Sequence, residues 1–247
     1  MKFYLLILAF FSAITCAQSL KPGIYKYDIK WENIKAAEAI LTVSVSHDGF
    51  RLQIKANTAG WLKPFYRLDY TADVLLLGSF KRVHGVALKK DNNEEEHIAY
   101  KRKDEVLIIE RKFKKKKKDK AGKITRELVD AWDPFSAAVA SLLAPWDTGL
   151  SYTYYVSNGK TEYTIILECV EVKRLSDGSS SIRIKPTVKS LNEKQIKKLK
   201  SVEVVVNDKG GVRTVSRIKS KVFIGNVYFD LRSKSPGELV FAQFNLD

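Results

Sequence analysis

An alternation of apolar and polar residues dominates the chain and predicts β-strands. Between 37 and 45 every second position is apolar, and Glu38, Thr42 and Ser44 lie among the positions between them. After the turn-like segment 46–49 the same period restarts at Phe50 and runs to Asn57. Successive side chains of a strand point to opposite faces, so these two segments predict a hairpin with one apolar and one polar face.

The same signals continue along the rest of the chain. The period holds through 68–76 and less regularly through 80–113, where Asp91-Asn92-Asn93 and Lys103-Asp104 indicate turns. Asn158-Gly159 is a strong hairpin signal. The later strands are expected over 152–156, 161–172, 181–188, 202–206, 213–221, 222–232 and 238–244. The fold class predicted is mostly β, a curved antiparallel sheet of the half-barrel or clam-like barrel kind with one short apolar helix.

The one helix is expected over 134–144. Asp133 suits the capping position, Pro134 suits the first turn, and Pro145 ends the segment. Nearly all residues between the two prolines are apolar or small, so we expect the helix to pack against the β structure.

The first residues predict a signal peptide over 1–17. A short apolar run from Phe3 to Phe11 is followed by Thr15-Cys16-Ala17, which suits cleavage before Gln18. An alternative is a lipoprotein anchored at Cys16. No later segment reaches the roughly 20 apolar residues that span a bilayer as a helix, so the mature chain is expected to be periplasmic, without a transmembrane span.

About 230 residues then remain, which predicts a single antiparallel β domain over 18–247. The chain carries a formal net charge of +15. This excess of positive charge bears on the partners and the solubility of the protein rather than on its fold.

A lysine-rich run is the strongest local feature, and we expect it to be an exposed hairpin tip that contacts anionic surfaces. Its candidate contact residues are Arg111, Lys112, Lys114, Lys115, Lys116, Lys117 and Lys118. Candidate partners are lipid, lipopolysaccharide or an anionic envelope polymer, with peripheral membrane contact. Nucleic acid is disfavoured as a partner because export would separate the protein from it, and because aromatic residues do not alternate with the lysines.

A second candidate site is an apolar pocket near the helix and the strand ends. Its candidate residues are Trp61, Tyr66, Phe135, Leu142 and Trp146. Such residues also form ordinary cores, but a curved sheet with a covering helix can enclose a lipophilic ligand.

Catalytic chemistry has no local signature here. His47, His84 and His97 are isolated, so no metal site, cofactor or catalytic triad is predicted from sequence. Cys169 lies in an apolar run and is expected to be a buried thiol.

Several short segments resemble a family of bacterial envelope proteins known as domain-of-unknown-function family 3108. They are 25–31 followed by Ala37-Glu38-Ala39, Thr58-Ala59-Gly60-Trp61 leading to Tyr66, Asp133-Pro134-Phe135-Ser136-Ala137, and Gly149 before a strand pair ending near Glu171. The resemblance implies a periplasmic, curved antiparallel β structure with no established reaction.

The sequence therefore favours a non-enzymatic envelope protein that binds a lipophilic or outer-membrane component. A structural module that binds protein or cell wall, and an enzyme whose site is assembled from distant strands, remain open alternatives.

Overall fold

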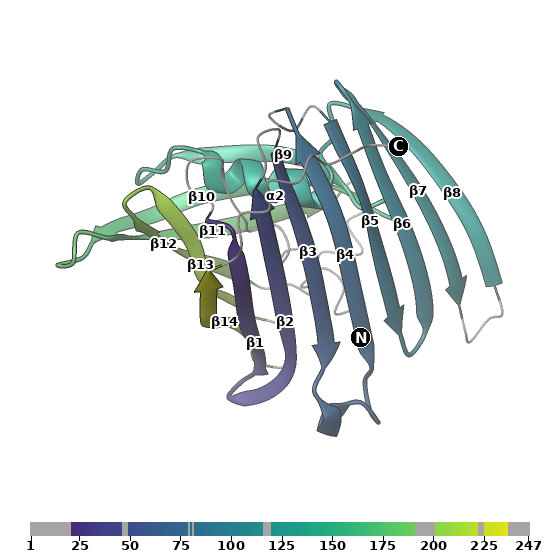
Figure 1. The fold of residues 1–247 in the computed structure, drawn as a ribbon, viewed down its shortest axis with the longest axis horizontal. Helices are drawn as coiled ribbons and strands as arrows, with labels where there is room; N and C mark the ends of the chain where they lie inside the picture. The colour runs from purple at the N-terminus through teal and green to yellow at the C-terminus, as the bar shows by residue number, and fades with distance from the viewer. Residues whose placement is uncertain are drawn as a thin grey trace. The chain divides into compact units, whose positions relative to one another are not determined.

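The computed structural model describes residues 21–45, 49–78, 80, 82–115, 120–190, 201–221 and 225–236 (Figure 1). The chain divides into two compact units. The described residues of the sheet unit fall within 21–28, 35–131 and 232–236, and those of the helix unit fall within 29–34 and 132–231. The predicted signal peptide and the predicted strand 238–244 lie outside the described residues, and one domain over 18–247 stays a prediction.

The sheet unit is an antiparallel meander in which each strand pairs with the next along the chain. A short 3-10 helix, η1 (Gly60–Leu62), lies between its third and fourth strands. The strands are β1 (Gly23–Trp31), β2 (Ile34–Val45), β3 (Gly49–Thr58), β4 (Leu68–Leu77), β5 (Arg82–Asp91), β6 (Glu94–Lys103), β7 (Val106–Lys115) and β8 (Lys120–Val129). The first strand is shared with the helix unit.

One face of the sheet unit carries its core, as the alternation predicts. Leu41 and Val43 of β2, Leu52 of β3, and Val74 and Leu76 of β4 are buried, and the residues between them are more exposed. Burial of apolar surface contributes roughly 25 cal/mol per Å², so this inward face holds the strands in register.

The helix unit begins with the helix and continues as a second antiparallel meander. Its elements are α2 (Pro134–Leu143), β9 (Ser151–Ser157), β10 (Glu162–Arg174), β11 (Ser180–Ser190), β12 (Ser201–Lys209), β13 (Val212–Lys221) and β14 (Asn226–Pro236). The predicted strand at 222–232 thus begins later and extends further.

The helix has the predicted start, because the Asp133 carboxylate accepts hydrogen bonds from the backbone N–H groups of Phe135 and Ser136. Leu142, 2% exposed, lies on its buried face. At the other end, the Arg213 guanidinium donates to the carbonyl oxygens of Leu142 at 2.6 Å and Ala144 at 2.7 Å. A cation at this end also matches the negative end of the helix dipole.

A mostly antiparallel β structure with one α-helix in the described part of the chain confirms the predicted fold class. Cys169 is buried, as expected, next to a bulge in β10. None of the helices in the described ranges is long and apolar enough to cross a membrane.

Candidate functional site

The lysine-rich run forms the hairpin of β7 and β8 at one end of the sheet unit. The strands extend further into the run than expected, since β7 continues to Lys115 and β8 begins at Lys120. Lys116, Lys117 and Lys118 lie outside the described residues. The described part of this hairpin, 111–115 with 120–123, is called the basic hairpin below.

The strand register places lysine opposite lysine at two positions of the basic hairpin. Lys112 pairs with Lys123, and Lys115 pairs with Lys120. Like charges directly opposite each other on neighbouring strands destabilise the pairing. The two lysine pairs therefore concentrate positive charge in the basic hairpin, and Glu110 offsets part of the repulsion at the Lys112–Lys123 pair.

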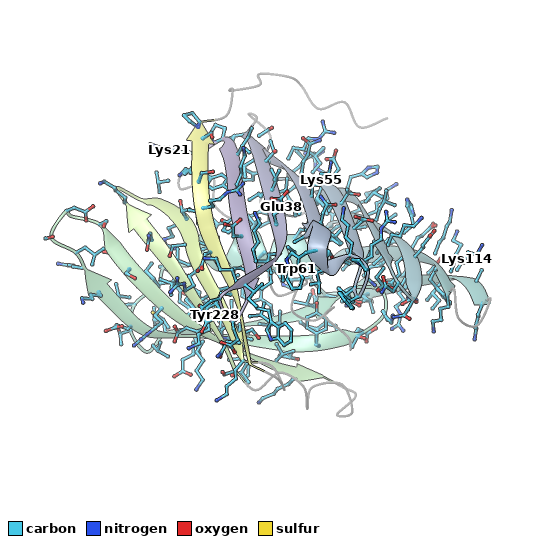
Figure 2. The ribbon with its side chains drawn as sticks, turned by 90° about the horizontal axis from the view of Figure 1, so that it is seen from below. Lys21, Glu38, Lys55, Trp61, Lys114 and Tyr228 are labelled. Atoms are coloured by element: carbon cyan, nitrogen blue, oxygen red, sulfur yellow. The ribbon has the colours of Figure 1, made fainter. Side chains whose placement is uncertain are left out.

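The lysines on the outward side of the basic hairpin are open to solvent. Lys112, Lys114 and Lys123 are exposed on this side, Lys120 is exposed on the face that carries Lys115 and Phe113, and Figure 2 marks Lys114 at this end of the sheet unit. Lys123 Nζ lies 2.9 Å from Glu110 Oε2, and this hydrogen bond lowers the pKa of the Glu110 carboxyl. Exposed ammonium groups in this spacing can bind several anionic headgroups at once.

The inward side of the same strand differs, because Arg111 is only 3% exposed. Its Nη2 atom lies 2.9 Å from Glu94 Oε1, and its Nε atom donates to Glu96 Oε1 at 3.0 Å. The inclusion of Arg111 among the surface-contact residues was wrong. Its side chain lies on the inward face of β7, together with Leu107 and Ile109. Its charge is paired with two carboxylates of the neighbouring strand β6.

Two further charges join this buried ionic cluster, which consists of Lys89, Asp91, Glu94, Glu96 and Arg111. Lys89 Nζ lies 3.1 Å from Glu96 Oε2 and 3.0 Å from Asp91 Oδ2. The pKa of Asp91 is raised, first by burial and then by the nearby Glu94 and Glu96 carboxylates, although its Oδ1 atom accepts two backbone N–H groups. The pKa of Asp91 is raised even though Lys89 lies within ion-pair distance of it.

Phe113 links the buried ionic cluster to the basic hairpin. The Arg111 guanidinium lies 4.5 Å from the ring centroid, and Lys115 Nζ lies 5.6 Å from it. On the facing strand, a Cβ atom built at Gly122 would come within 2.8 Å of the ring. Glycine at position 122 therefore lets the Phe113 ring approach the backbone of β8 closely. The inward side is packed by this contact, while the outward lysines are exposed to solvent.

Sequence reasoning missed the buried ionic cluster, although a signal was present. Lys89 and Asp91 are in phase with Val83 and Ala87 on β5, so the alternation itself assigns them to the inward face. Glu94 and Glu96 of β6 are buried as well.

The candidate pocket residues are divided between the two units. Phe135, Leu142 and Trp146 are buried on or just after α2 in the helix unit. Trp61 and Tyr66 belong to the β3–β4 loop of the sheet unit, where Trp61 is 51% exposed. A shared apolar pocket stays a prediction.

The histidines of the described ranges, His84 and His97, are both exposed, and His47 lies outside those ranges. Within the same ranges, no three His, Cys, Asp or Glu side chains are grouped so that they could hold a metal ion.

Comparison with known proteins places this geometry in a family. Residues 26–232 match the family model described as a protein of unknown function (DUF3108). The chain belongs to the DUF3108 family. The resemblance seen in its short segments is thereby confirmed.

The fold of this DUF3108 protein is similar to that of a protein whose structure has been solved. That structure is the crystal structure of a β-barrel-like protein of domain of unknown function DUF1849 from Brucella abortus, with a TM-score of 0.60 and 10% sequence identity. The alignment covers 90% of this chain and 100% of the other. At this identity the likeness concerns the fold. A comparison with curated proteins gives no match.

Proposed function

We propose that this DUF3108 protein is a non-enzymatic envelope protein that binds an anionic, amphipathic lipid component through the basic hairpin. The observation that carries the proposal is the register of β7 and β8, which sets Lys112 opposite Lys123 and Lys115 opposite Lys120. The two pairs lie on opposite faces of the hairpin, and at either one a bound phosphate or carboxylate would reduce the repulsion further than the Glu110–Lys123 ion pair does. Lipid headgroups and lipopolysaccharide carry such groups at high density.

The buried ionic cluster supports the proposal by fixing the base of the basic hairpin. Arg111 joins β7 to Glu94 and Glu96 of β6, so the outward lysines project from paired strands. Ligand binding then loses little conformational entropy in the backbone.

A vesicle-binding titration tests the proposal. The full mature chain is mixed with vesicles of phosphatidylcholine alone and with vesicles that also contain phosphatidylglycerol. We expect binding to the anionic vesicles only, with an affinity that falls steeply as salt is added. Equal binding to both compositions, or none to either, would overturn the proposal.

We also propose that the chain is exported and cleaved after Ala17, leaving a periplasmic protein. The support is the short apolar run followed by Thr15-Cys16-Ala17. The mass of the protein isolated from its own cell envelope should correspond to a start at Gln18. An intact Met1 would overturn export with cleavage, and a lipid on Cys16 would replace the soluble form with an anchored one.

A further inference from the structure

We infer that the β3–β4 loop is a second lipid contact of the sheet unit and that Trp61 and Phe65 enter the headgroup region of an anionic membrane. Phe65 is 77% exposed and Trp61 is 51% exposed. Single exposed apolar residues are ordinary, but here two aromatic side chains lie within five positions, with exposed Pro64 between them. This aromatic loop, residues 59–67, has no counterpart in the other described connections of the sheet unit.

Hydrogen bonds hold the aromatic loop in its exposed shape. Trp61 Nε1 donates to the Lys35 carbonyl oxygen at 2.8 Å. The Asn92 side chain spans the other end, since its amide donates to the Phe65 carbonyl at 3.2 Å and its Oδ1 accepts from Arg67 N at 2.8 Å. The aromatic rings are therefore presented to solvent by an ordered loop, which reduces the entropy lost on binding.

The composition of the aromatic loop matches a membrane interface. Lys63 and Arg67 are exposed in the same loop as the two aromatic residues, and Arg67 Nε also lies 2.7 Å from Asp69 Oδ2. Trp and Phe place their rings among the headgroups and upper acyl chains, while lysine and arginine extend their charges to the lipid phosphates. An anionic lipid surface offers both environments, so it is the partner that fits this combination.

The position of the aromatic loop adds a geometric argument. Strands alternate in direction, so the β3–β4 and β7–β8 connections lie at the same end of the sheet unit (Figure 1). Figure 2 views this end and labels Trp61 and Lys114 from the two segments. Three strand spacings separate β4 from β7, about 14 Å. That span suits an extended surface better than one small ligand.

This inference rests on the proposed function, because it assigns a second contact to the same lipid partner. The test compares Phe65→Ser with Leu88→Ser, a control that removes an exposed apolar side chain, 46% exposed, on β5. Binding is measured with vesicles of phosphatidylcholine and phosphatidylglycerol. Phe65→Ser removes one aromatic ring that would be buried in the membrane, so it should weaken the affinity about tenfold. Leu88→Ser should bind like the wild type.

A second measurement reports insertion directly. Vesicles that contain brominated phosphatidylglycerol should quench the tryptophan fluorescence of the wild type, and Trp61→Phe should lose most of that quenching. If the wild type binds and neither effect is seen, the inference is overturned while the proposed function stands. If the wild type binds no anionic vesicle, both are overturned.

Discussion

Two neighbouring charged residues of β7, Arg111 and Lys112, lie in opposite environments. Arg111 points inward and is held by Glu94 and Glu96, whereas Lys112 points outward and faces Lys123 across the hairpin. The inward charge is bound by two buried carboxylates, whereas the outward Lys112 and Lys123 face each other in solvent with Glu110 beside them. Charge on a strand therefore reports on function only when its phase and its cross-strand partner are known.

The largest expected effect comes from breaking the inward side. Arg111→Met should destabilise the protein by about 3–5 kcal/mol, because it removes the cation bound by two buried carboxylates. Lys112→Met, one residue away, should change the free energy of unfolding by less than about 0.5 kcal/mol. Denaturant unfolding of both variants measures the difference. Equal effects would show that the two faces of β7 are not distinct.

A buried apolar residue of the helix unit, Leu142, provides a reference for the stability loss expected from Arg111→Met. Leu142→Ala should cost about 2–5 kcal/mol, through lost transfer free energy and the cavity left behind. The measurement is again denaturant unfolding. A cost under about 1 kcal/mol would mean that Leu142 borders a void, which would favour the predicted ligand pocket near α2.

The pH dependence of stability sharpens the contrast between inward and outward carboxylates. Burial raises the pKa of Asp91, so its contribution to stability falls as the pH rises from the usual aspartate pKa of about 3.9 through the raised value. The hydrogen bonds from Arg51 lower the pKa of Asp73, so its contribution is present above about 3.9 and is lost as the pH falls through the lowered value.

Asp91→Asn and Asp73→Asn should therefore change stability with opposite pH trends. The wild-type advantage over Asp91→Asn should shrink as the pH rises, and the advantage over Asp73→Asn should grow. Unfolding free energies measured from below to above the usual aspartate pKa of about 3.9 show both trends. Two trends of the same sign would contradict the assigned environments.

The sequence was informative where local rules decide the structure. Period-two alternation predicts the strands because only one face of each meander is packed, and Asp133 followed by Pro134 predicts where α2 begins. The contact of Arg213 with Ala144 could not be predicted, since 69 residues separate the two partners. The burial of Arg111 follows from the phase it shares with Leu107 and Ile109 on β7, whereas its charge alone predicts exposure.

The most direct test of the account is the affinity of Lys112→Ser/Lys114→Ser for anionic vesicles. The matched control is Lys101→Ser/Lys103→Ser, which removes the same charge from exposed positions on β6. Each lysine near an anionic surface contributes about 1 kcal/mol, so the basic-hairpin variant should bind at least about tenfold more weakly, and the control should change less than about twofold. An equal loss in both variants would show that binding follows net charge alone and would contradict a site at the basic hairpin.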